Sequence, residues 1–200
     1  MRNDPIVREG SQNRLSRREL ARTLLTGLAA GVLPATISPL HPVHKHLLDG
    51  ILLDSAEEAL TGGSYQPAFL SAAQLRSVER LSEAIIPGSR KAQSAEFIDL
   101  LLSVESARHQ EDFLASLSAM DEAGAKAFHQ GIAALDKDQL HQLLEAASSK
   151  DSADYPHFEN LKQWSSGAYY SSEMGMRELG WTPDRVFPTY PGCTHPENHA

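Results

Sequence analysis

The chain has 200 residues, of which 41% are hydrophobic, with a formal net charge of −8 and a single cysteine. This length and apolar content are typical of one domain that can bury a real core. The first 22 residues carry a net charge of +3, which leaves −11 on the remainder. An acidic body argues against a nucleic-acid binder, which needs a basic face. One cysteine excludes an internal disulfide and a cysteine-rich metal or iron–sulfur site.

The N-terminal segment, residues 1–40, has the pattern of an export signal. Arg17 and Arg18 follow a serine, and an apolar run extends over residues 24–33. A basic region before about 7–15 apolar residues is typical of a secretory signal, and the consecutive arginines indicate the twin-arginine route. A membrane span needs about 20 apolar residues, so the run is too short for a permanent anchor. We expect export to the periplasm and cleavage within residues 34–46. The alternative is a short buried helix behind two surface arginines.

Residues 41–68 are expected to form a linker that contains a short helix over residues 49–60. His41, His44 and His46 lie close together at its start, and imidazole is a common metal ligand. A proline between the first two makes the backbone irregular, and no acid or cysteine completes a ligand set. We therefore favour a solvated segment over a metal site.

Two amphipathic helices are predicted on either side of a break at Pro87. The first begins with a capping-box pattern, Ser71 followed by Gln74. It ends before Pro87, because proline cannot continue a helix. The second has Ser94 as its expected N-cap. Apolar residues recur at helical spacing in both helices, at Leu75, Val78, Leu81 and Ile85 in the first and at Phe97, Leu100, Leu101 and Val104 in the second.

Three further helices are predicted, over residues 113–132, 136–147 and 157–170. Gly124 weakens the first of them, and Asp136 three residues before Gln139 resembles a capping box at the start of the second. No segment shows the alternation typical of strands. The fold class is therefore all-α, a compact helical bundle over residues 69–178 with antiparallel neighbours joined by short loops. We expect one core that contains Leu81, Ile85, Phe97, Leu101, Leu144 and Trp164.

The C-terminal tail, residues 179–200, is rich in proline and aromatic residues. Such a segment is extended and has little internal hydrogen bonding, yet it contains Trp181, Phe187 and Tyr190, which a solvated tail would avoid. One interpretation is that these aromatics cover the chain's own core. The other is that they bind another protein, since aromatics concentrate at the centres of interfaces. Cys193 either pairs with another chain or is buried, and we favour burial.

Several of these segments together resemble the gluconate 2-dehydrogenase subunit 3 family. They are Ile85-Ile86-Pro87, Phe97-Ile98-Asp99, the helix over 135–144, the run Gly167-Ala168-Tyr169-Tyr170-Ser171-Ser172, and Pro191-Gly192-Cys193. The arginine-pair leader also resembles that family's leader, and the likeness covers most of residues 70–193. The loop after Pro87 departs from the family, because Gly88-Ser89-Arg90-Lys91 stands where an acidic turn containing Gly and Ala is usual.

The resemblance implies a non-catalytic small subunit that pairs with a large flavoprotein of the glucose–methanol–choline type, often together with a cytochrome c subunit. The large subunit would hold FAD and oxidise a sugar, sugar acid or polyol. The small subunit would assist its maturation and carry the twin-arginine signal for both, which places the complex in the periplasm at the outer face of the inner membrane. No dinucleotide fingerprint and no haem-attachment motif occurs in the chain, so neither FAD nor haem is expected in it.

The resemblance leaves the partner contact to be assigned from the residues. We assign it to the aromatic tail residues Trp181, Phe187 and Tyr190, together with Tyr169 and Tyr170. We expect no catalytic, cofactor-binding or metal-binding residue.

Two alternatives remain. One is an exported helical interaction protein unrelated to a dehydrogenase. The other is a free-standing enzyme that uses Glu83, Asp99, Glu105 or the scattered histidines. The helical pattern suggests that these acids lie on solvated polar faces, which argues against catalysis.

Overall fold

The computed structural model describes residue 46 and residues 50–61 and 65–180. Within this part the chain is helical and contains no strand, as the sequence predicts. The leader arginines, two of the three clustered histidines and the tail aromatics lie outside the described residues, as does the cysteine; they are Arg17, Arg18, His41, His44, Trp181, Phe187, Tyr190 and Cys193.

Seven α-helices and one 3₁₀ helix follow one another along the described chain. They are α3 (Gly50–Thr61), α4 (Ala72–Ile85), α5 (Ser94–Val104), α6 (Ala107–Phe128), η1 (Ile132–Ala134), α7 (Lys137–Ser148), α8 (Tyr155–Tyr170) and α9 (Glu173–Glu178). None of the described helices combines the length and the apolar content that a membrane crossing requires.

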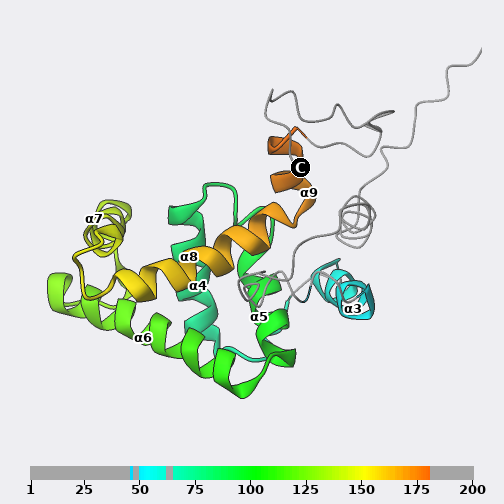
Figure 1. Ribbon diagram of the computed structural model, residues 1–200, viewed down its shortest axis with the longest axis horizontal. Coiled ribbons are helices and arrows are strands. Elements are labelled where there is room, and N and C mark those ends of the chain that lie inside the picture. Colours follow the sequence, from blue (N-terminus) through cyan, green and yellow to red (C-terminus); the bar gives the residue numbers. More distant parts are fainter. Residues whose placement is uncertain (1–45, 47–49, 62–64, 181–200) are drawn as a thin grey trace, which may run out of the picture.

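Helix α8 is the central element of the bundle. It crosses the middle of the molecule in Figure 1, with α7 at one end and α9 at the other, and it packs against α4, α5, α6, α7 and α9. Its Trp164 is fully buried and meets the Phe113 ring of α6 edge-to-face, with the ring centroids 5.6 Å apart. Such an aromatic pair adds about 0.5–1.5 kcal/mol to the stability that burial alone provides.

The predicted core is confirmed in most of its members. Leu81, Phe97, Leu101, Leu144 and Trp164 are buried in one cluster, whereas Ile85 is partly buried and packs against that cluster. Helix α3 joins the same core through Leu53 and Ala56.

The capping-box patterns in the sequence correctly predicted the starts of two helices. The capping boxes at Ser71 and Asp136 are both formed, with Gln74 and Gln139 completing them. Helix α4 ends at Ile85, one residue before the predicted Ile86-Pro87-Gly88 break, with Ile86 as its C-cap. The turn that follows is held by Ser89, whose hydroxyl donates to the Ser82 and Ile86 carbonyls at 3.1 and 2.6 Å.

Two details of α5 were predicted wrongly. Ser94 is not its N-cap: that position is Gln93, in the left-handed region with φ 53°, and Ser94 is already inside the helix and buried. The turn that precedes α5 makes the difference, because the Ser94 N–H donates to the Ser89 carbonyl. Val104 is 52% exposed, since Ile98 and Leu102 occupy the inner face in its place.

Candidate functional site

Asp99 is the most completely engaged polar side chain in the bundle. It is fully buried on α5, and its carboxylate accepts hydrogen bonds from the Tyr65 hydroxyl at 2.6 Å and from the backbone N–H groups of Ala68, Phe69 and Leu70 at 2.6, 3.1 and 2.5 Å. These four donors replace the hydrogen bonds to water that the carboxylate loses on burial, as a buried carboxylate requires. Asp99 therefore fixes the segment that leads into α4. Burial, and then the hydrogen bond to Asp99, raise the pKa of Tyr65 above its usual range.

Glu105 forms a second buried carboxylate site at the C-terminal end of α5. It accepts a hydrogen bond from the Ser106 N–H at 2.7 Å, and its other oxygen lies 2.6 Å from His46 Nε2. The His109 Nδ1 lies 2.9 Å from Glu105 Oε1, at an angle too poor for a hydrogen bond, so this contact is mainly electrostatic. Burial opposes ionisation of Glu105, but the Ser106 N–H and the two histidines outweigh it and lower its pKa to about 2.

The two histidines do not build a metal site with Glu105. They contact different oxygens of the carboxylate, and no group of three His, Cys, Asp or Glu side chains in the described part of the chain is arranged to hold a metal ion. Of the three clustered histidines in the sequence, only His46 is described, and its contact is with Glu105.

The expectation that Asp99 and Glu105 lie on solvated faces was wrong. Both are buried, and the donors to Asp99 and the His46 partner of Glu105 come from far away in the sequence. Glu83 is closer to the expectation, since it is only partly buried and accepts hydrogen bonds from the Gly88 and Arg90 N–H groups at 3.1 and 2.8 Å. These two bonds tie the turn after Pro87 to α4. All three carboxylates therefore hold backbone segments in place.

The two predicted partner-binding tyrosines lie in different environments at the end of α8. Tyr169 is fully buried, and burial followed by the nearby Glu178 carboxylate raises its pKa to about 12. Its hydroxyl has no hydrogen bond of ordinary geometry. Tyr170 is 39% exposed and Leu179, just beyond α9, is 65% exposed. Of the tyrosine pair, Tyr170 is thus the one with an exposed side chain.

Helix α9 turns back closely on the end of α8. A Cβ added at Gly175 would lie 2.4 Å from the Tyr169 carbonyl oxygen, so only glycine permits this approach. Tyr170 and Leu179 therefore lie at one corner of the fold, which we call the α8–α9 corner. The described chain ends there at Gly180, and Trp181, Phe187 and Tyr190 follow outside the described residues.

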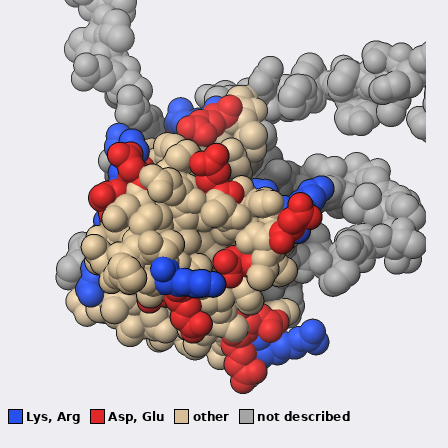
Figure 2. Space-filling model, turned by 90° about the vertical axis from the view of Figure 1, so that its left-hand side faces the viewer, with Lys and Arg blue, Asp and Glu red and all other residues tan. Residues whose placement is uncertain are grey.

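The charged side chains on the face at the α7 end of the bundle are scattered. Figure 2 shows acidic and basic side chains interspersed around a broad uncharged area, with no basic patch on this face. The phosphate backbone of a nucleic acid needs a continuous basic surface. This face does not offer one.

Comparisons with known proteins give one match. A family model described as gluconate 2-dehydrogenase subunit 3 matches residues 72–187, from the start of α4 into the tail. No curated protein and no solved structure matches the chain. The matched range covers more than half of the sequence, and it contains Asp99, Glu105 and the α8–α9 corner, whereas the donors to Asp99 and the His46 partner of Glu105 lie before it. The chain belongs to the gluconate 2-dehydrogenase subunit 3 family.

Proposed function

We propose that this chain is the non-catalytic small subunit of an exported flavin-dependent dehydrogenase complex, and that it assists maturation and export of a FAD-bearing large subunit. The family match is the observation that carries the proposal. The large subunit, of the glucose–methanol–choline type, supplies FAD and oxidises a sugar, sugar acid or polyol. A cytochrome c subunit can receive the electrons in such a complex.

The described carboxylates support a non-catalytic role. Asp99, Glu105 and Glu83 all accept backbone N–H groups. A general acid or base must reach a substrate proton at hydrogen-bond distance. Carboxylates that hold backbone segments in this way serve the fold, which suits a subunit that acts by binding another protein.

Export is proposed to depend on Arg17 and Arg18 acting as a twin-arginine address for the whole complex. Replacing both with Lys should leave the chain and its large subunit in the cytoplasm. A double change of Arg2 and Arg8 to Lys is the matched control, because it alters the same leader outside the pair. Periplasmic dehydrogenase activity is the measurement, and full activity in the Arg17→Lys, Arg18→Lys chain would contradict the proposal.

The partner contact is proposed to centre on the α8–α9 corner and the tail that follows it. A proline-rich segment loses less chain entropy on docking than a flexible one, because its φ angles are already restricted. Large aromatic side chains can each bury a large surface area at an interface, and the tail supplies Trp181, Phe187 and Tyr190. Tyr170 and Leu179 extend that apolar surface onto the folded domain.

Co-purification of the large subunit tests the contact. Trp181→Ala or Phe187→Ala should weaken assembly by about 2 kcal/mol, as at other interface centres, and Tyr170→Ala should weaken it less. Val104→Ala, at an exposed apolar residue of α5, is the control and should leave the yield unchanged. A chain that ends at Gly180 should stay folded and lose the large subunit. If that shortened chain retains the large subunit at full yield, the tail is not the interface. If it unfolds, the tail belongs to the chain's own core.

The same experiment decides the alternative. A chain that never captures a flavoprotein from the cell that makes it would be an exported interaction protein of another kind.

A further inference from the structure

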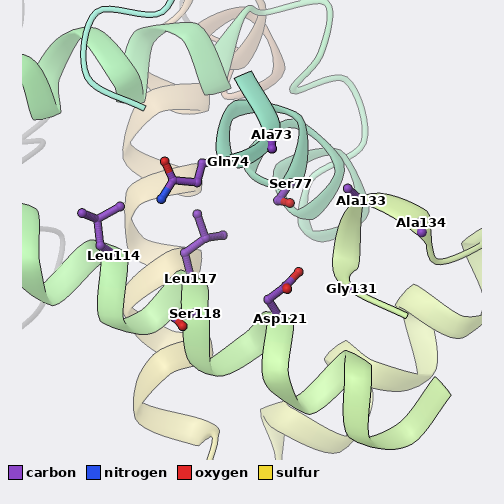
Figure 3. Close-up of a pocket in the computed structure, with 10 residues that line it drawn as sticks. All are labelled: Ala73, Gln74, Ser77, Leu114, Leu117, Ser118, Asp121, Gly131, Ala133 and Ala134. Carbon is purple, nitrogen blue, oxygen red and sulfur yellow. The ribbon is translucent and has the colours of Figure 1, made fainter. Parts of the chain in front are cut away.

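A groove lies between α4, α6 and the 3₁₀ helix η1. It has a volume of about 440 Å³ and is lined by Gln74, Ser77, Leu114, Leu117, Asp121 and Ala133, among others. In Figure 3 the Leu114 and Leu117 side chains rise from α6 toward Gln74 on α4, and Asp121 lies further along α6 beneath Ser77. We call this the α4–α6 groove.

The groove combines apolar side chains with the uncharged polar Gln74, Ser77 and Ser118, and it has one negative charge at its end. Leucine and alanine side chains supply the apolar walls, and Asp121 is the only charged residue in the lining. The Asp121 Oδ1 accepts the Ile132 N–H at 2.8 Å, while no described residue donates to its second oxygen. A segment that combines apolar side chains with a positive charge fits this surface.

The walls of the groove are fixed before anything binds. The Arg80 guanidinium of α4 donates to the carbonyls of Ile132, the first residue of η1, and of Leu135, which follows its last residue. Asp121 holds the same short helix at its N-terminal end. A preformed groove costs a ligand less ordering on binding.

The chain's own leader has the matching chemistry. Leu20, Leu24 and Leu28 recur every four residues, so a helix would carry them along one face. Arg17, Arg18 and Arg22 surround the start of that stripe. An apolar stripe does not remain in water when a complementary surface is within reach.

The dimensions agree with this pairing. The two α6 residues at the ends of the lining, Leu114 and Asp121, lie about 10 Å apart along the helix axis, at 1.5 Å per residue. Successive leucines of the leader stripe would be about 6 Å apart on the same basis. The groove can therefore receive two turns of a helix.

The leader is also long enough to reach the groove. His46 is held at Glu105, two residues before α6 begins. The 13 residues from Leu33 to His46 span at most about 43–47 Å when extended. Helix α6 is about 33 Å long, so every point along it lies within that reach.

We propose that the leader helix, residues 16–33, docks in the α4–α6 groove of its own chain, with its leucine stripe against Leu114 and Leu117 and an arginine near Asp121. Docking would keep the apolar run covered until the translocation machinery takes it. The proposal goes beyond the proposed function and does not depend on a flavoprotein partner.

Limited digestion of the full-length chain with trypsin tests the docking, because trypsin cleaves after Arg17, Arg18 and Arg22. A docked leader is cut only when it opens, so the rate reports the open population. Ala133→Arg places bulk and a positive charge in the groove at an exposed position. It should raise cleavage about tenfold or more, the equivalent of about 1.4 kcal/mol. Ala127→Arg, at an exposed alanine of α6 that points away from the groove, is the matched control and should leave the rate near that of wild type.

A cross-link gives a second measurement that does not depend on the groove substitution folding well. In a Cys193→Ser chain, Leu20→Cys and Ala133→Cys should form a disulfide within one molecule, because Leu20 lies among the arginines that would sit near Asp121, whereas Leu20→Cys and Ala127→Cys should not. Three results would overturn the proposal. They are rapid leader cleavage in wild type, equal protection in the Ala133→Arg chain together with no intramolecular disulfide, and a disulfide that forms only between two copies. All three are read on the isolated chain, so failure to find a large subunit would not affect them.

Discussion

The two buried carboxylates of α5 are six positions apart and are satisfied by different chemistry. Asp99 accepts three backbone N–H groups and one tyrosine hydroxyl, all neutral donors. Glu105 accepts one backbone N–H and contacts two imidazoles. The first site holds the segment that leads into α4. The second holds His46, just before α3.

This difference predicts how the stability of each site depends on pH. The Tyr65 hydroxyl donates to Asp99 only while it keeps its proton, so this part of the Asp99 site depends on Tyr65 staying neutral. The Glu105 site depends on the carboxylate staying ionised. We therefore expect the Asp99 site to weaken in base and the Glu105 site to weaken in acid.

The largest effect should come from removing Asp99. Asp99→Ala leaves four buried or partly buried donors without their acceptor, and each unsatisfied group costs about 1–3 kcal/mol. We expect a loss of at least about 3 kcal/mol in the free energy of unfolding, comparable to breaking a buried charge pair. Urea unfolding at neutral pH measures it. Leu101→Ala, in the same helix, is the reference for a simple cavity and should cost about 2–5 kcal/mol. A loss below 1 kcal/mol for Asp99→Ala would mean that water replaces the carboxylate.

The next effect concerns acid stability at Glu105. The folded pKa of about 2 lies below the ordinary value of 4.5. A lowered pKa contributes stability above pH 4.5, and that contribution is lost as the pH falls toward 2. It is on the order of 3 kcal/mol, at about 1.36 kcal/mol for each unit of pKa.

Glu105→Gln should therefore flatten the stability profile between pH 5 and pH 2. Unfolding free energies at several pH values would show the change. Glu111→Gln, at an exposed acid of α6, is the control and should keep the acid dependence of wild type. An unchanged profile for Glu105→Gln would show that other carboxylates carry the acid dependence.

The sequence revealed the features of this fold that depend on near neighbours. Ser71 with Gln74 and Asp136 with Gln139 fixed two helix starts, and Pro87 fixed one end, because caps and prolines act within four residues. The carboxylate sites could not be found in this way. The donors to Asp99 come from about 30 positions earlier, and His46 lies 59 positions from Glu105. No local periodicity carries such a pairing, so a carboxylate on a helix was taken for a solvated one.

The partner surface was predictable only in part, for a related reason. Tyr169 and Tyr170 are neighbours with similar chemistry, and the sequence treats them alike. The return of α9 at Gly175 separates them, since it buries Tyr169 and leaves Tyr170 exposed. The tail aromatics stay a prediction, because they lie outside the described residues.

A smaller effect should appear at Tyr65 in base. Burial and the Asp99 carboxylate raise the pKa of Tyr65 above its ordinary value of 10. A raised pKa contributes stability that is present below pH 10 and is lost as the pH rises further. Tyr65→Phe removes one hydrogen bond to a charged acceptor and should cost about 1–2 kcal/mol at neutral pH. It should also remove this part of the alkaline loss. Tyr155→Phe is the control at a tyrosine outside the Asp99 site, and a steeper alkaline loss in Tyr65→Phe than in wild type would contradict the assignment.

The smallest effect should distinguish the two histidines at Glu105. An ionised carboxylate only accepts hydrogen bonds, so His46 Nε2 must donate in the 2.6 Å contact. The His109 contact is longer and poorly angled, and His109 is more exposed. His46→Ala should therefore cost about 1 kcal/mol and His109→Ala less.

Amide hydrogen exchange in α3 distinguishes the two histidine variants, because α3 packs on α5 and begins four residues after His46. In His46→Ala the start of that segment loses its contact with Glu105, so exchange in α3 should speed up while α8 stays protected. His109 is part of α6 and its loss should leave α3 unchanged. Equal exchange in α3 for both variants would show that Glu105 does not anchor the N-terminal segment, and that the acid dependence at this site belongs to the α5–α6 junction alone.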